Sequence, residues 1–270
     1  MRKSPSAGVS DKYDTGENTM DLGLEGKTAL ITGAGSQTGF GKGIALALAK
    51  EGCDIIVNDI NLEGAEQTAA EVKSMGRRAM ALKADVSDPD QVNDMVEEAM
   101  KQFGKIDILV NNAGVGTPPK PFVESTAADW ERGISSNLWG MMYCTKAVLP
   151  QMIARKSGKI INMSSVAGLE GTPTGTVYGA AKAGIVNFTA GLALELADSG
   201  INVNSIAPGL GNTSFLAACG FPPDYIEKAK KLDAEGKTIT PRDIGNTVAF
   251  LASDVSKHII GQCIRVAGTT

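Results

Sequence analysis

The sequence has almost none of the residues that build metal centres or histidine-dependent hydrolase sites. Its 270 residues include one histidine, His258, and four widely separated cysteines, Cys53, Cys144, Cys219 and Cys263. A single histidine excludes a multi-histidine zinc site and a serine–histidine hydrolase, so we predict no metal. Because no two cysteines form a C-x-x-C pair, we expect reduced, buried thiols.

A positive charge excess and a long apolar run are also missing. The net charge is -4, and lysines and arginines are scattered, which argues against nucleic acid as a partner. No segment reaches the ~18 apolar residues of a membrane span. Residues 1–21 are polar, with no apolar signal region, and we expect a flexible arm there, a single domain over 22–270, and a cytoplasmic protein.

What the chain does have is a regular alternation of short apolar runs with longer stretches of helical period. Runs rich in valine and isoleucine are typical of strands buried on both faces of a parallel sheet. We expect strands at 28–33, 54–59, 78–84, 107–111, 158–163, 201–206 and 262–266. The predicted fold is α/β, a single-domain, Rossmann-like, doubly wound parallel sheet of about seven strands with helices on both faces.

The helices have recognisable ends. Asp88 can cap a helix that Gly104 ends, with an apolar stripe at helical spacing between them. Thr126 predicts the start of one long helix from Ala127 to Ile153. Another is expected from Tyr178, or slightly earlier, to Asp198.

The stretch TGAGSQTGFGKGIA, residues 32–45, follows a strand and opens a helix. Glycines there permit a tight turn, and the helix N-terminus supplies free N–H groups for a pyrophosphate, although a flexible turn would look similar. Asp59 ends the next strand, where a carboxylate can accept hydrogen bonds from an adenosine ribose and repel a 2′-phosphate. This favours NAD over NADP; the alternative for Asp59 is a solvated turn.

Polar residues at later strand ends and on one helix could carry chemistry. Tyr178 and Lys182 are four residues apart, so they share a helix face, where an ammonium would lower the pKa of the phenol. Ser164 and Ser165 follow a strand and could bind a substrate oxygen or close a turn. The asparagines of LVNNAG, residues 109–114, could serve a site or only satisfy loop backbone.

Taken together, these motifs resemble the short-chain dehydrogenase/reductase family, in its single-domain branch of about 250 residues. The resemblance runs from Leu24 to Gly268, and Asn137, Ser165 and Tyr178 have the family's catalytic spacing. Its other motifs here are the Thr32, Gly33, Gly39 and Gly41 loop, Asp59, ADVSD at 84–88, NNAG at 111–114, SNLWG at 136–140, Lys182, and APG at 207–209.

The resemblance implies hydride transfer without a metal. Tyr178 would exchange a proton with the substrate oxygen, Ser165 would hold that oxygen, Lys182 would lower the pKa of Tyr178 and bind the nicotinamide ribose, and Asn137 would hold a relay water. The implied cofactor residues, besides Tyr178 and Lys182, are Gly33, Ser36, Gly39, Phe40, Gly41, Asp59, Asp85, Val86, Asn112, Ala113, Gly114, Pro208, Gly209 and Thr213.

Three positions depart from the family pattern. Gly33 and Gly39 are six positions apart rather than four, as if Gln37 and Thr38 had been inserted, so the loop must bulge. Gly211 stands where an apolar residue is usual, which suggests a more mobile segment. Ala267 replaces an acidic residue near the C-terminus.

The leading functional hypothesis is an NAD-dependent oxidoreductase for a hydrophobic secondary alcohol or ketone, including one linked to an acyl-coenzyme A. Apolar residues in 115–122, 166–175 and the candidate lid 212–240 suggest the substrate pocket. Two alternatives are an NADPH-dependent 3-oxoacyl reductase and a non-catalytic subunit of a hetero-oligomer. We expect a homodimer or homotetramer.

Overall fold

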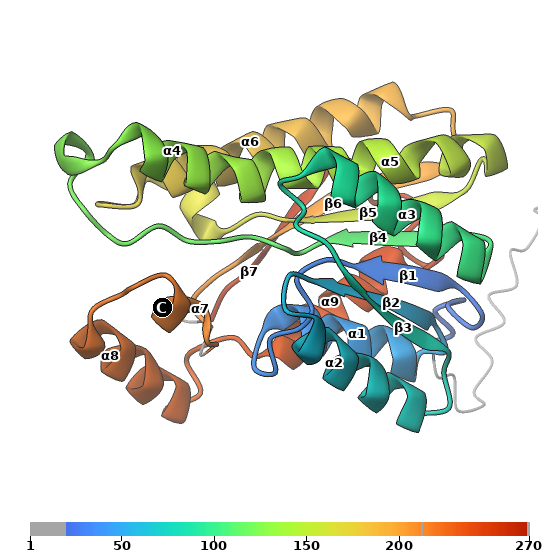
Figure 1. The fold of residues 1–270 in the computed structure, drawn as a ribbon, viewed down its shortest axis with the longest axis horizontal. Coiled ribbons are helices and arrows are strands. Elements are labelled where there is room, and N and C mark those ends of the chain that lie inside the picture. The colour runs from blue at the N-terminus through green and yellow to red at the C-terminus, as the bar shows by residue number, and fades with distance from the viewer. Residues whose placement is uncertain (1–19, 212, 269–270) are drawn as a thin grey trace, which may run out of the picture.

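A computed structural model describes residues 20–211 and 213–268; most of the predicted N-terminal arm lies outside them. Seven parallel strands form one sheet in the order β3-β2-β1-β4-β5-β6-β7, which confirms the predicted fold (Figure 1). The chain builds outward from β1 to β3 and then returns to place β4 on the other side of β1. The strands are β1 Thr28–Ile31, β2 Asp54–Asp59, β3 Ala79–Lys83, β4 Ile108–Asn111, β5 Gly158–Met163, β6 Ile201–Pro208 and β7 Cys263–Val266.

Helices cover both faces of the sheet. Helices α1, α2 and α9 lie on one face, and α3, α5 and α6 lie on the other (Figure 1). The short helices α7 and α8 connect β6 to α9 beside the sheet. Their bounds are α1 Phe40–Lys50, α2 Leu62–Ser74, α3 Pro89–Phe103, α4 Ala127–Ile134, α5 Gly140–Arg155, α6 Thr176–Glu195, α7 Phe215–Ala218, α8 Pro223–Ala234 and α9 Pro241–Ala252.

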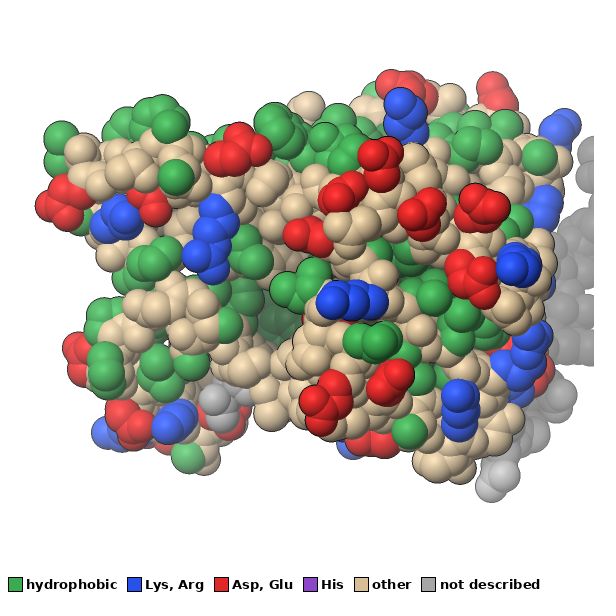
Figure 2. All heavy atoms as spheres, in the orientation of Figure 1, with side chains coloured by type: hydrophobic (Ala, Val, Ile, Leu, Met, Phe, Trp, Pro, Cys, Tyr) green, Lys and Arg blue, Asp and Glu red, His purple; other side chains and the backbone are tan. Residues whose placement is uncertain are grey.

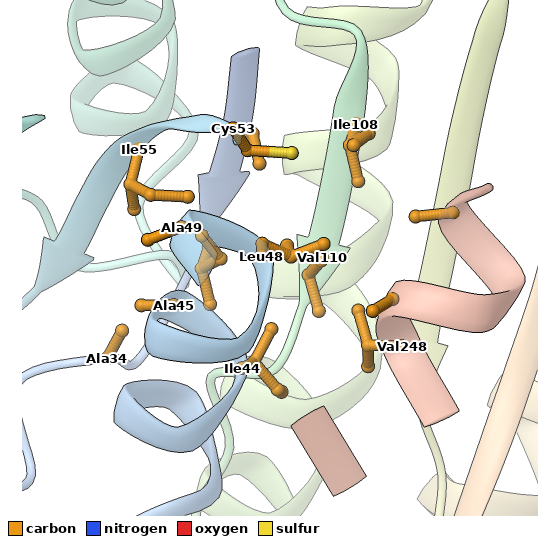
Figure 3. Packing of buried hydrophobic residues seen from close by; sticks show 14 of the residues in the cluster. Ala34, Ile44, Ala45, Leu48, Ala49, Cys53, Ile55, Ile108, Val110 and Val248 are labelled. Atoms are coloured by element: carbon orange, nitrogen blue, oxygen red, sulfur yellow. The ribbon is translucent and has the colours of Figure 1, made fainter. Parts of the chain in front are cut away.

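Two apolar cores hold the layers together, one on each face. On the first, Ile44 and Leu48 of α1 pack toward Val110 of β4, with Val248 of α9 beside them (Figure 3). On the second, α3, α5 and α6 cover the opposite sides of the same strands. A fully buried leucine or isoleucine stabilises the fold by about 1.5–3 kcal/mol, so these strands are anchored firmly.

Close packing of α1 on α9 explains Gly43, one of the two glycines of the loop region that lie outside the family motif. A Cβ atom on Gly43 would lie 2.5 Å from the Pro241 backbone oxygen, and one on Gly245 would lie 2.6 Å from the Gly43 oxygen. The two helices therefore meet backbone to backbone. Gly43 serves this packing and not the glycine turn.

Most predicted helix ends are confirmed. The Asp88 side chain accepts hydrogen bonds from the first turn of α3, and Gly104 ends the helix with φ 76°. Helix α6 begins at Thr176, two residues before Tyr178, but it ends at Glu195 and gives way to a turn three residues before the predicted end at Asp198. By length and composition α6 could cross a membrane, but it packs against the turn at Ser135–Trp139 and against β6 within the domain.

The predicted single helix from Ala127 to Ile153 is wrong in one respect. Between α4 and α5 the backbone widens into a π-helical turn, η2, at Ser135–Trp139. Gly140 follows it and packs against Val86, where a Cβ atom would lie 2.8 Å from the valine side chain. Such turns occur often at functional sites, and this one carries Asn137.

Candidate active site

The crevice between the carboxyl ends of β1 and β4 is the point where the strand order reverses, and ligands bind at such points in open α/β sheets. Gly33 after β1 has φ 65°, and a Cβ atom on it would lie 2.6 Å from Ala113 Cα. The Asn112 amide donates hydrogen bonds of 2.9 Å to the Thr32 and Gly33 carbonyls. The side chain of Asn112 thus satisfies loop backbone, and the two turns are held in close contact.

Asp59 contacts the glycine loop through a residue that the sequence prediction missed. Its Oδ2 accepts a 2.7 Å hydrogen bond from the Gly35 N–H, and Oδ1 accepts one from Asn61. A Cβ atom on Gly35 would lie 2.8 Å from Asp59 Cγ. The extra glycine in T-G-A-G was the available signal. Asp59 is therefore fixed beside the loop, as a carboxylate for a ribose must be.

The inserted Gln37 ties the loop to α2. Its Nε2 donates to the Gly35 carbonyl at 2.9 Å and to the Gly64 carbonyl at 3.0 Å. Its Oε1 accepts a 2.8 Å bond from Lys42 Nζ, and Lys42 also pairs with Glu71. The expected bulge thus has a structural anchor.

The remaining predicted cofactor residues border the same edge but are not all brought together. Val86 is buried beneath η2, whereas Asp85 is exposed and accepts from the Ser87 N–H at 2.9 Å. Gly209 after β6 donates to the Val266 carbonyl. The Thr213 hydroxyl accepts from the Phe215 N–H at 3.3 Å, which ties Thr213 to the start of α7.

Two adjacent serines at the end of β5 have different roles. Ser164 is buried, and its hydroxyl donates a 2.8 Å hydrogen bond to the Lys182 carbonyl in α6, which joins the helix to the strand. Ser165 is only half-buried and is hydrogen-bonded to Tyr178. Ser165 Oγ also accepts a 3.2 Å hydrogen bond from the Ala167 N–H, which closes a turn, and its contact with a substrate oxygen stays a prediction.

The expected lowering of the Tyr178 pKa is not found in the chain by itself. Burial raises the pKa of Tyr178 to about 12, and the hydrogen bond with Ser165 only partly opposes it. Lys182 Nζ lies 5.6 Å from the Tyr178 ring centre and donates to the Met163 carbonyl at 2.9 Å. Burial lowers the pKa of Lys182 to about 8. Desolvation disfavours both charged forms and is the largest cause of both shifts.

Asn137 leaves one buried polar atom without a partner. Its amide nitrogen donates to the Val115 carbonyl at 2.7 Å and to the Gly133 carbonyl at 2.9 Å, while Oδ1 accepts no hydrogen bond. A Cβ atom on Gly114 would lie 2.5 Å from Asn137 Oδ1 and 3.4 Å from Lys182 Nζ. An unpaired acceptor and an ammonium that face one point beside a glycine fit a water or a cofactor hydroxyl.

The segment after β6 lies against Tyr178 and against the loop that follows β4. The Phe215 ring centre is 6.1 Å from that of Tyr178. Cys219 is buried against Gly116, so the α7 helix closes over the loop that follows β4. The surface in Figure 2 is hollowed between the α7–α8 unit and α4, with hydrophobic side chains beside the hollow. A cavity of about 350 Å³ at the opposite edge of the sheet contains none of the predicted site residues.

The fold and this cluster define a nicotinamide-dependent oxidoreductase of the short-chain dehydrogenase/reductase family, to which the chain belongs. Residues 33–268 match the family model described as Enoyl-(Acyl carrier protein) reductase.

Individual relatives differ in their named substrates. The chain is 41% identical over 243 residues to the 3-oxoacyl-(acyl-carrier-protein) reductase FabG of Staphylococcus aureus, covering 90% of this chain and 97% of that protein. It is 37% identical over 242 residues to the cis-4-hydroxycyclohexanecarboxylate dehydrogenase of Sinomonas cyclohexanicum, covering 90% and 95%. A crystal structure from Sinorhizobium meliloti, assigned to the short-chain alcohol dehydrogenases, superposes with a TM-score of 0.81 at 35% identity, covering 89% and 94%.

Proposed function

We propose that this protein transfers a hydride between NAD(H) and a hydrophobic secondary alcohol or ketone. The observation that carries the proposal is the grouping of Ser165, Tyr178, Lys182 and Asn137 beside the β1–β4 crevice. The nicotinamide supplies the redox chemistry when it is bound. The non-catalytic alternative does not explain why all four groups are kept together.

Each protein group has a task that its surroundings support. With a pKa of about 12, Tyr178 is protonated at neutral pH and can donate its proton to a carbonyl oxygen. Ser165 would hold that oxygen. Lys182, with a pKa of about 8, is mostly charged at pH 7 and would bind a ribose hydroxyl, while the free Oδ1 of Asn137 would accept from a relay water.

The choice of NAD rests on the charges near the predicted ribose position. Asp59 is fixed by the Gly35 N–H, and Lys42, just after the loop, is already paired with Glu71. A 2′-phosphate would thus meet a carboxylate without a free ammonium from Lys42 to offset it.

A second candidate is a 3-oxoacyl thioester reductase using NADPH. The 41% identity with a protein of that name favours it. The hydrophobic side chains beside the hollow between the α7–α8 unit and α4 suit either an acyl chain or a cyclic alcohol (Figure 2).

Initial rates would separate these candidates. We would assay acetoacetyl-coenzyme A reduction with NADH and NADPH, and cis-4-hydroxycyclohexanecarboxylate and simple secondary alcohols with NAD and NADP. Higher kcat/KM with NADH or NAD supports the proposal. A marked NADPH preference with acetoacetyl-coenzyme A supports the second candidate, and a lack of NADH and NADPH binding would leave only the non-catalytic subunit.

We further propose a homo-oligomeric, cytoplasmic enzyme, in keeping with the predicted dimer or tetramer. Helix α6 is apolar along its length but only partly buried, and its Leu194 side chain is 80% exposed. Met142 and Ile153 of α5 are also exposed. Apolar surface of this kind favours association, which light scattering measures directly.

A further inference from the structure

The glycine loop, at and beside its two inserted residues, contacts the segment that leads into α7. Helix α7 carries Phe215 and would form one side of the proposed substrate pocket; it is called the substrate wall below. Ser36 Oγ lies 2.8 Å from Ser214 Oγ, and the Ser214 N–H donates a 3.2 Å hydrogen bond to Thr38 Oγ1. These residues are separated by more than 170 positions in sequence. Ser36 and Thr38 thus form a contact between two loops that belong to different parts of the site.

Phe40 adds an apolar contact to the same pair of segments. A Cβ atom on Gly211 would lie 2.7 Å from Phe40 Cζ, so the ring occupies the space that a side chain at position 211 would need. Gly211 is buried and forms a parallel bridge with Ile239. The absence of a side chain at 211 is therefore matched by a large residue in the loop.

The segment held in this way carries an aromatic ring that lies beside Tyr178, the proposed acid. Ser214 immediately precedes α7, whose first residue is Phe215, and the Phe215 ring centre is 6.1 Å from that of Tyr178. In Figure 1, α7 and α8 stand beside the sheet rather than under a covering helix layer. A contact at Ser214 thus has a direct effect on where Phe215 lies.

The other side of the loop is fixed independently. Gln37 donates to the Gly64 carbonyl in α2, and Asp59 accepts from the Gly35 N–H. The loop therefore lies between a firm support and the α7 segment. A shift of the loop would be passed to Ser214 rather than absorbed by α2.

We propose that Thr38 and Ser36 are positioning residues that dock the start of α7 on the glycine loop and thereby place Phe215 beside Tyr178. Because the proposed function puts the cofactor pyrophosphate at this loop, cofactor binding would order the substrate wall. This part rests on the proposed function, whereas the docking contact does not.

The test compares Thr38→Val, which keeps the shape and removes the hydroxyl, with Thr38→Ser, which keeps the hydroxyl. Thr247→Val is the matched control, since it removes an outer threonine hydroxyl that bonds only within α9. With acetoacetyl-coenzyme A, or the secondary alcohol that the wild type oxidises fastest, Thr38→Val should raise KM about three- to tenfold with kcat nearly unchanged. Thr38→Ser and Thr247→Val should behave like the wild type.

Hydrogen exchange gives a readout that needs no activity. The Ser214 amide of the cofactor-free chain should exchange several-fold faster in Thr38→Val than in the wild type or Thr38→Ser. NADH should slow proteolysis within 213–239 in the wild type and much less in Thr38→Val. If the Ser214 amide exchanged at the same rate in Thr38→Val as in the wild type, the docking contact would be overturned. If exchange changed as expected but NADH did not slow proteolysis of the wild type, the docking contact would stand and its link to cofactor binding would be overturned.

Discussion

The candidate catalytic cluster, which consists of Asn137, Ser165, Tyr178 and Lys182, meets the glycine loop at one edge of the sheet, but the two are held there in different ways. Ser165 lies at a strand end, and Tyr178 and Lys182 lie on a helix, so the register of regular elements places them. The loop is held instead by contacts with distant segments: Asp59 and Asn112 bond to its backbone, and its own Gln37 side chain reaches α2. Substitutions in the cluster should therefore lower the rate of the chemical step. Substitutions in the loop should instead change the position of the loop and its affinity for the cofactor.

The sharpest test of this division is Tyr178→Phe. It removes the acid–base hydroxyl and leaves α6 intact, so we expect kcat to fall by roughly 10²- to 10⁴-fold while the NADH dissociation constant changes less than about twofold. Steady-state kinetics and fluorescence titration measure both. Tyr225→Phe makes the same change at an exposed position on α8 and should alter neither kcat nor the NADH dissociation constant. A comparable loss of NADH affinity in Tyr178→Phe would break the division.

The two serines test the division within one strand end. Ser165→Ala should lower kcat by about 10²-fold because a donor to the substrate oxygen is lost. Ser164→Ala removes the bond to the Lys182 carbonyl instead, and should lower the free energy of unfolding by about 1 kcal/mol. Kinetics and urea unfolding of both variants decide the matter. Equal losses of kcat would show that the serines share one role.

On the loop side, Asp59→Asn should act on affinity. The substitution weakens the contact with the Gly35 N–H and removes the carboxylate offered to the ribose. NADH should therefore bind about tenfold more weakly, and the difference between the dissociation constants of NADH and NADPH should become smaller. Asp94→Asn, which makes the same change at an exposed position on α3 outside the candidate site, is the matched control. If kcat at saturating NADH fell instead, Asp59 would belong with the cluster.

The smallest effect concerns the charge of Lys182. Burial lowers its pKa to about 8, so above pH 8 the folded chain has released a proton that the unfolded chain keeps, and unfolding free energy rises with pH. Tyr178, with its pKa raised to about 12, works in the opposite sense above pH 10. Lys182→Met lacks the first effect, so it should be the more stable chain at pH 7, with the difference shrinking by pH 10. Urea unfolding at four pH values measures this; a constant difference would contradict it.

Much of the fold and the cluster was predictable because it depends on local patterns. Buried apolar runs predicted all seven strands, and the spacing of Tyr178 and Lys182 predicted a shared helix face. The pKa of Tyr178 was not predictable from that spacing, because it depends on how much water the folded chain excludes.

The loop was less predictable because its contacts are tertiary. Gln37 and Thr38 could be recognised as an insertion, but their partners are brought near only by the fold. Likewise Gly211 suggested a mobile segment when viewed in sequence, and only the structure shows Phe40 against it.

The π-helical turn at Ser135–Trp139 also sets the phase between two helices. An α-helix advances about 100° per residue, so one residue more or less in this turn would rotate α4 against α5. Upstream of the turn, the Gly133 carbonyl accepts a hydrogen bond from Asn137, and downstream Met141 and Cys144 are buried in the core. The number of residues in the turn sets both orientations at once, so length there is under tighter constraint than residue type. Deletion of one residue of the turn other than Asn137 should rotate Asn137 away from Ser165, Tyr178 and Lys182, although all four residues remain in the chain.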